Sequence, residues 1–323
     1  MKLKLFVASA FILVSAFVAR PQAAYPPETS NAALRYWMAF AEMQDPPADK
    51  AIQDLLEKTA IGEAAWDEKK LGTILDANSA AIAMMQRASK LPDCDWGIEY
   101  SRGSRASIAY APRARVLARL NTLQGIREMA NGNSQAAVDT WRAGIRFSEH
   151  LANGGTLIFT LIAKSALLPN LRAITAQARQ GHLNSSQLHQ IYVPIDKMRR
   201  DGFNWSAAWS LEGLVGEQFL AELRSAKDLT ATYEMLMGEP LPTGATAPSA
   251  EDVHNYREYM ETAQAALSLP PDTARTRMSA LATQKSALSE VVQRIIPNVQ
   301  KESDARAEVF MARKELLKTL APK

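Results

Sequence analysis

Apolar residues recur at three- and four-residue intervals along most of this chain, which is the spacing of an amphipathic α-helix. Alternating runs of Val, Ile, Thr and aromatic residues, typical of strands, are missing, and Ala and Leu dominate instead. The pattern therefore predicts an all-α fold. Pairs of glycine or proline interrupt it and mark the ends of predicted helices, as at Pro46-Pro47, Gly154-Gly155 and Pro270-Pro271.

The first predicted helix follows Ser30, a suitable N-cap, and carries Ala33, Trp37, Phe40 and Ala41 on one face. Further helices are expected over 48–58, 63–89 with a break near Gly72, 185–200, 203–238 and 250–268, followed by two that Pro297 separates. The proline-rich residues 239–249 predict a linker or long loop.

A helical hairpin is predicted over residues 112–153. Pro112 suits a helix start, and Asn131-Gly132-Asn133 suits the turn. Arg127 falls inside the apolar arc of the first helix, so we expect it to have an acidic partner or to lie at the edge of the arc. The apolar run 157–168, too short to span a bilayer, predicts a central buried helix that Pro169 kinks or ends.

Small residues stand in the hairpin where its two helices would cross. Gly125, Ala137 and Gly144, with Trp141 and the turn residue Gly132, have the spacing of a tetratricopeptide unit, which the segment resembles. Other positions of that motif depart from it, namely Asn121, Gln124 and Glu128, and no second copy follows at the repeat spacing. The expected architecture is antiparallel hairpins, partly tetratricopeptide-like, in an α-α superhelix or an irregular helical array; a generic hairpin is the alternative.

Short motifs over residues 31–170 carry a second resemblance. They are Asn31-Ala32-Ala33 with Tyr36, Cys94-Asp95-Trp96, the hairpin, and Leu157-Ile158. Together they resemble a group of uncharacterised exported or membrane-anchored bacterial helical proteins. The resemblance implies a helical fold and assigns no activity and no active-site residue.

The N-terminus has the pattern of a signal peptide, with Lys2 and Lys4 before the uncharged run Leu5 to Val18 and the small pair Ala23-Ala24. The sequence therefore predicts a signal peptide over 1–24 and an exported, periplasmic or extracellular protein. Cleavage after Ala24 places Gln22, which is not small, at the minus-three position, so an uncleaved membrane anchor is the alternative. The mature chain is expected to comprise a helical region at 25–183 and another at 184–323, packed as one domain without a stable membrane span.

Removal of the leader changes the charge. The whole chain has 37 basic and 34 acidic residues, but residues 1–24 contain three bases and no acid, which leaves 34 of each. A protein without a basic surplus is not expected to bind nucleic acid. Cys94 is the one cysteine and has no internal disulfide partner. We expect it to be a small buried apolar side chain; pairing with another chain is the alternative.

Motifs for nucleophilic, metal-dependent or phosphate-binding catalysis are absent from the sequence, which predicts no catalytic residue, no metal site and no cofactor. His254 and Glu258 are four residues apart, which fits a solvated ion pair better than a metal site. Trp205 and Trp209, one helical turn apart, fit core packing better than ligand stacking.

The candidate binding residues lie between 93 and 115 and are Asp95, Trp96, Arg102, Arg105 and Arg113. Arginine forks suit carboxylate or phosphate groups, and loops on a helical scaffold often carry function. The alternative is that the acids and arginines pair with one another and hold the loop in place, with Trp96 buried and Asp95 capping a backbone N–H.

Three functions are compatible with these features. The first is a scaffold or interaction protein of the cell envelope that binds a peptide or protein in a groove between hairpins. The second is a hydrolase or lyase of envelope polymers with dispersed carboxylates, which requires two carboxylates within about 10 Å in one cleft. The third is a carrier of an apolar ligand, lined by some of the twelve methionines and the 157–168 run.

Overall fold

The computed structural model describes residues 28–106, 108 and 110–321, so the predicted signal peptide lies outside the described residues. This part of the chain is helical and contains no β-strand, which confirms the all-α prediction. The first half comprises α1 (Ala32–Glu42), α2 (Lys50–Ala60), α3 (Glu68–Ala77), α4 (Ser79–Ala88), the 3-10 helix η1 (Tyr100–Arg105), α5 (Ala111–Ala130), α6 (Ser134–Ala152) and α7 (Leu157–Arg179). The second half comprises α8 (Ser185–Lys197), α9 (Trp205–Arg224), α10 (Leu229–Met237), α11 (Ala250–Leu267), α12 (Pro271–Gln284), η2 (Lys285–Ala287), α13 (Glu290–Ile295) and α14 (Val299–Leu320).

The hairpin α5–α6 is held together at its small residues. A Cβ on Gly125 would lie 2.2 Å from the indole nitrogen of Trp141, so the two helices approach closely only because this residue is glycine. Gly144 likewise faces the side chains of Asn121 and Asn170, which brings α7 against the same hairpin. The turn between α5 and α6 uses Gly132 at φ +81°, a conformation that glycine adopts without strain.

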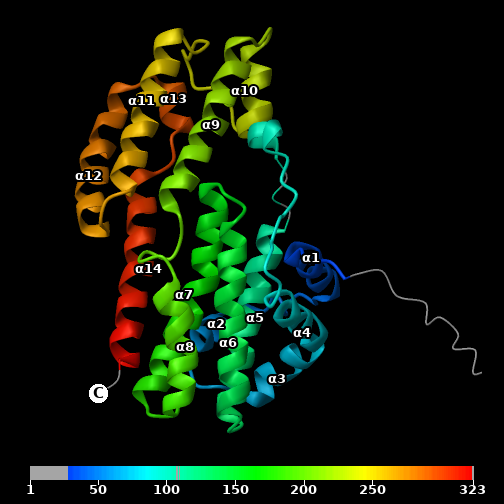
Figure 1. Cartoon of the computed structure of the whole chain (residues 1–323). Helices are drawn as coiled ribbons and strands as arrows, with labels where there is room; N and C mark the ends of the chain where they lie inside the picture. Colours follow the sequence, from blue (N-terminus) through cyan, green and yellow to red (C-terminus); the bar gives the residue numbers. More distant parts are fainter. Residues whose placement is uncertain (1–27, 107, 109, 322–323) are drawn as a thin grey trace, which may run out of the picture.

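Helix α7 is the centre of the molecule and packs on α5, α6, α9 and α14 (Figure 1). Pro169 does not end it, contrary to one of the two expectations, and the helix continues to Arg179. Eleven further residues therefore join the predicted run, because Asn170, Leu171 and Ile174 beyond the proline are fully buried against neighbouring helices. Among the described helices, α7 alone is long and apolar enough to cross a membrane. Of the apolar 18-residue stretch within it, 67% is buried inside the protein.

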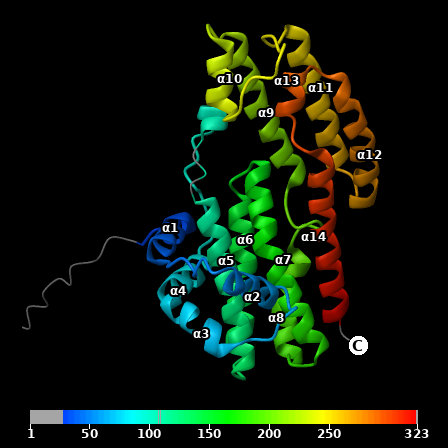
Figure 2. The same ribbon diagram turned by 180° about the vertical axis from the view of Figure 1, so that it is seen from behind.

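The remaining helices form two groups around this centre. Helices α1 to α4 cover α5 and α6 on one side, whereas α9 to α13 gather at one end, and α14 runs back along α7 (Figures 1 and 2). Buried residues of both predicted regions, such as Trp141 and Trp209, belong to one continuous hydrophobic cluster. Trp205 and Trp209 are both buried, as the core interpretation predicted.

Several predicted boundaries are wrong. Asn31, not Ser30, caps α1, because its side-chain oxygen accepts the N–H of Ala33 at 3.1 Å. The predicted face of α1 is also wrong, since Trp37 and Ala41 point outward. The helix expected from Glu63 begins at Glu68 and breaks at Asn78 instead of Gly72. The segment 203–238 is two helices, and residues 239–249 form the predicted loop.

Candidate functional site

The loop that joins α4 to α5 is attached to the start of α1 by backbone and side-chain hydrogen bonds. Asn31 donates to the carbonyl of Asp95 at 2.9 Å and accepts the N–H of Asp95 at 2.9 Å, and the N–H of Ala32 donates to the carbonyl of Asp93. The Asp95 carboxylate accepts the N–H of Gly97 at 2.9 Å, as the capping interpretation predicted. Asp95 therefore stabilises the described loop and its attachment to α1.

Trp96 is buried in a cluster of aromatic rings. Its indole nitrogen donates to the carbonyl of His150 at 2.7 Å, and its ring stacks on Tyr110 with centroids 4.4 Å apart. The Tyr36 hydroxyl lies 2.8 Å from Nδ1 of His150, whose Nε2 has no hydrogen-bond partner among the described residues. Burial, assisted by Arg146, lowers the pKa of His150 to about 4, so this imidazole is neutral near pH 7. The cluster is closed and packs the loop onto α1 and α6.

The three predicted arginines each have partners close by. Arg102 pairs with Glu99 at 3.2 Å, and Arg105 pairs with Glu222 of α9 at 3.2 Å. Arg113 donates to the carbonyls of Phe40 and Met43 at 3.0 and 3.1 Å and lies 3.8 Å from Asp45. The five residues predicted as a binding site thus surround the loop without converging on one cavity, and a binding role for them stays a prediction.

Cys94 lies beside this cluster and is half-buried. Burial is the main cause that raises the pKa of its thiol to about 12, with Asp95 adding to the effect and Arg146 opposing it. A thiol that stays protonated at neutral pH is a poor nucleophile, because the thiolate is the reactive species. The geometry therefore favours the structural interpretation of Cys94.

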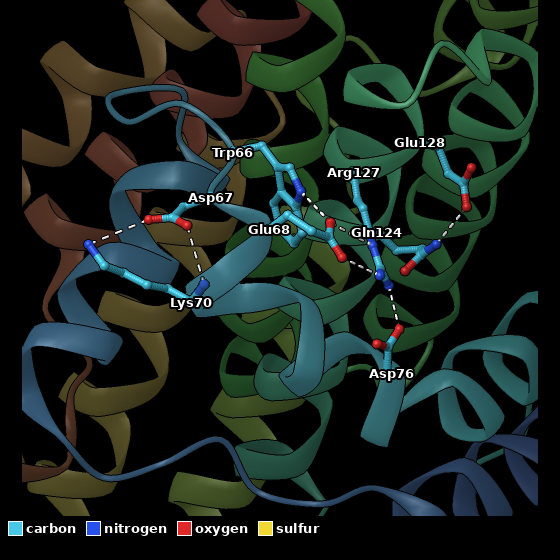
Figure 3. Close-up of polar contacts among 8 residues, drawn as sticks. All are labelled: Trp66, Asp67, Glu68, Lys70, Asp76, Gln124, Arg127 and Glu128. Carbon is cyan, nitrogen blue, oxygen red and sulfur yellow. Dashed lines mark hydrogen bonds and ion pairs between the residues drawn. The ribbon is translucent and has the colours of Figure 1, made fainter.

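Arg127 has the acidic partners that its position predicted. It binds Glu68 through two nitrogens at 2.5 and 3.1 Å and Asp76 at 2.6 Å (Figure 3). Hydrogen bonds from Arg127 and from Trp66 lower the pKa of the Glu68 carboxyl. The network fixes α3 on α5, and all three guanidinium nitrogens of Arg127 donate to carboxylates of the protein itself.

Two carboxyl groups with raised pKa values lie near the start of α7, of which Glu302 is buried and Glu212 is half-buried. Glu302 is 5% exposed, and its Oε2 has no hydrogen-bond partner among the described residues. Burial, with a contribution from Glu212, raises its pKa to about 7. Glu212 accepts the N–H of Leu157 at 3.3 Å, and burial raises its pKa as well. His254 and Glu258, by contrast, are exposed and 3.9 Å apart, in accord with the predicted ion pair.

A groove of about 880 Å³ lies between α2, α5 and α7 and is open to solvent. Its walls are mainly apolar, with Ala111 and Val116 from α5, Ile158 and Ile162 from α7, and Ile61 after α2. Ile158 is 40% exposed, although it is a large hydrophobic side chain. Ligand sites in proteins have this character, an apolar surface with a few polar groups.

Two arginines lie along the α5 wall of the groove. Arg115 is exposed and Arg119 is half-buried, one turn further on. Arg119 donates to the Gln53 amide oxygen at 2.9 Å, while its Nε has no partner. Among residues 28–106, 108 and 110–321, neither arginine has a carboxylate within ion-pair distance. Burial lowers the pKa of Arg119, an effect that Glu57 at the groove edge partly offsets.

Sequence reasoning missed this groove. Its residues come from three helices that are distant in sequence, and only the four-residue spacing of Arg115 and Arg119 on the arginine-rich helix hinted at a shared face. No group of three or more His, Cys, Asp or Glu side chains in the described part of the chain is arranged to hold a metal ion.

Comparison of the chain with models of protein families, with curated proteins and with solved structures finds no match. The groove and its two arginines therefore rest on the geometry described above.

Proposed function

We propose that the protein is a helical binding protein, and that the groove between α2, α5 and α7 holds a peptide segment of a partner protein. The observation that carries the proposal is the pair Arg115 and Arg119, two arginines without carboxylate partners in the described structure, beside an apolar wall. A peptide with an apolar side chain and a nearby carboxylate satisfies both features, because a guanidinium binds a carboxylate with two parallel hydrogen bonds.

The openness of the groove favours a peptide over a small apolar ligand. A carrier gains most by enclosing its cargo, since sites for small molecules bury 70–90% of the ligand surface. Here Arg115, Glu57 and Ser165 are exposed along the groove. A peptide can lie in such a groove with one side in water, so the carrier hypothesis has less support.

The hydrolase alternative also has less support. Two carboxylates, Glu258 and Glu261, line another groove of about 670 Å³ between α11 and α12. They are three residues apart on one helix and so lie on the same wall, whereas glycosidic bond cleavage needs carboxyl groups on both sides of the scissile bond. Glu212 and Glu302, whose pKa values are raised, line neither of these grooves.

Selection from a displayed library of random peptides tests the proposal. Peptides enriched on the wild-type chain should combine apolar residues with an acidic group, and their affinity should fall at least tenfold for the Arg115→Gln/Arg119→Gln variant, or about 1.4 kcal/mol. The control is Arg224→Gln, which removes an exposed arginine of α9 far from the groove and should leave the affinity unchanged. Equal binding to wild type and to the groove variant, or no enriched peptide, would contradict the proposal.

We also propose that the protein acts outside the cytoplasm, on the basis of the leader pattern in residues 1–24. Expression of the full-length gene in a bacterium, followed by fractionation, should place the protein in the cell envelope. The intact mass distinguishes a mature chain that begins at Tyr25 from one that keeps its leader as an anchor. Recovery from the cytoplasm with the leader intact would contradict export.

A further inference from the structure

Helix α1 is apolar on both of its faces. Its inner face, with Ala33, Tyr36 and Phe40, is buried in the core. Its outer face carries Leu34, Trp37, Met38 and Ala41, all exposed and spaced as one stripe. Arg35 and Glu42 are the only charged residues among the eleven of the helix. A helix that is apolar all round is expected to be covered on all sides, by protein or by lipid.

The exposure of this stripe is unusual for the molecule. Leu34, Trp37 and Met38 are 53%, 41% and 54% exposed, and they are neighbours on one short helix. Other large hydrophobic side chains with comparable exposure occur singly, as Leu214 does on α9 and Met235 on α10. Single exposed apolar residues are common on protein surfaces, whereas a contiguous group marks a contact surface.

The place of α1 in the chain indicates what covers the stripe. The apolar run Leu5 to Val18 precedes it, with thirteen residues between Val18 and Ala32. A linker of that length spans at most about 45 Å. Helix α1 is the first helix of the described residues and lies at the periphery of the molecule (Figures 1 and 2). If the run Leu5 to Val18 lies in a bilayer, the short linker therefore keeps α1 close to the membrane surface. The tether also raises the local concentration of lipid, so a small apolar surface suffices.

The charges around α1 point to apolar insertion without attraction by anionic lipid. Arg35 is paired with Glu28, and Arg113 is engaged by the Phe40 and Met43 carbonyls near Asp45. Both of these arginines, in the described part of the chain, thus have acidic or carbonyl partners. A second copy of the chain is a weaker candidate, because an eleven-residue helix is about 16 Å long, and a stable interface buries about 800 Å² on each partner.

We propose that the outer face of α1, formed by Leu34, Trp37 and Met38, is a lipid-contact surface that lays this side of the protein on the membrane to which its leader attaches. Trp37 suits the boundary between headgroups and acyl chains, since tryptophan concentrates there. The proposal is independent of the peptide groove and concerns the chain that keeps residues 1–24.

Site-specific labelling tests it. The full chain with Leu34→Cys is labelled with an environment-sensitive fluorophore and reconstituted into phosphatidylcholine vesicles that contain a nitroxide-labelled lipid. Leu214→Cys and Met235→Cys are matched controls, because both positions are 61% exposed on other helices. The chain without an added cysteine serves as a blank for labelling of Cys94.

The label at position 34 should be quenched severalfold by the lipid nitroxide and protected from iodide in the water, and the labels at 214 and 235 should show the reverse. Protection from iodide without quenching by the nitroxide means that protein covers the stripe, which overturns the lipid proposal in favour of a second copy. Free access of iodide to position 34 means that nothing covers it and overturns the proposal as well.

Discussion

At the scale of single residues, Glu302 is an acidic side chain buried in the core. Its carboxyl is buried, and one of its oxygens has no hydrogen-bond partner among the described residues. Lys301 and Lys164 partly offset the effect of burial on its pKa, but Lys164 is itself paired with Glu308 at 2.8 Å. Ionisation of such a group is costly, so burial raises its pKa to about 7. The native protein therefore keeps a proton on Glu302 over a pH range in which the unfolded chain has lost it.

The raised pKa of Glu302 makes the free energy of unfolding depend on pH. The folded pKa lies above the ordinary value of 4.5, so the stabilising contribution is complete below about pH 4.5 and is lost as the pH rises towards 7. Up to about 3 kcal/mol is involved, at 1.36 kcal/mol for each pKa unit. Denaturant unfolding at pH 5 and pH 8 should show that Glu302→Gln loses less stability across this interval than wild type does.

Glu234→Gln is the matched control, because Glu234 is an exposed carboxyl of α10 without an ion pair in the described structure. Its pH dependence should follow that of wild type. His150 acts in the opposite direction between its lowered pKa of about 4 and its usual value of 6.5, and the comparison of variants removes its contribution. Parallel pH curves for wild type and Glu302→Gln would show that Glu302 titrates normally.

At the scale of elements, close helix crossings depend on glycine at particular positions. Gly125→Ala places a methyl group 2.2 Å from Trp141, so we expect a loss of about 1–3 kcal/mol through overpacking. Gly213→Ala is the control, since its Cβ would meet Met260 at 3.6 Å, an ordinary contact. There the better helix propensity of alanine should stabilise the protein by up to about 1 kcal/mol. Thermal unfolding of both variants measures the difference, and equal effects would contradict the crossing geometry.

The same elements show which features a sequence can predict. The hairpin from Pro112 to the end of α6 was predictable, because its start, turn and apolar stripe agree with one another. The buried face of α1 was not, since apolar residues surround that helix and periodicity gives no preferred side. The continuation of α7 through Pro169 depends on burial by distant helices, which outweighs the cost of one proline.

The candidate site was less predictable than the fold. Asp95 and Trp96 were predicted as binding residues, with anchoring of the loop as the alternative, and their described hydrogen bonds to Gly97 and His150 agree with that alternative. The groove was not predicted from the sequence, because Ile158 and Arg119 become neighbours only when α7 packs on α5. That Arg115 and Arg119 have no carboxylate partner among the described residues is likewise a property of the packed structure.

At the scale of the whole molecule, α7 links the two predicted regions. It packs on α5 and α6 from the first region and on α9 and α14 from the second, and their buried residues form one cluster. Neither region can therefore lose its structure without exposing one side of α7. We expect the described part of the chain to unfold as one cooperative unit.

Hydrogen exchange in increasing urea measures this. Peptides from α5 and from α11 should lose protection at the same urea concentration, and Leu171→Ala in α7 should lower both midpoints together. Leu171 is fully buried, so the substitution should cost about 2–5 kcal/mol. Loss of protection in one region at a clearly lower concentration would show that the regions are independent.

The proline in α7 also gives the proposed peptide groove a direction. Pro169 has no N–H to donate to the carbonyl of Ser165, and both residues line the groove opposite the arginines of α5. One wall therefore has hydrogen-bond donors for a carboxylate, and on the other wall the Ser165 carbonyl lacks the N–H donor that a residue other than proline would supply. Under the proposed function, we expect a peptide that uses both features to lie in one orientation, so the N-to-C direction of the bound segment becomes part of the specificity of the groove.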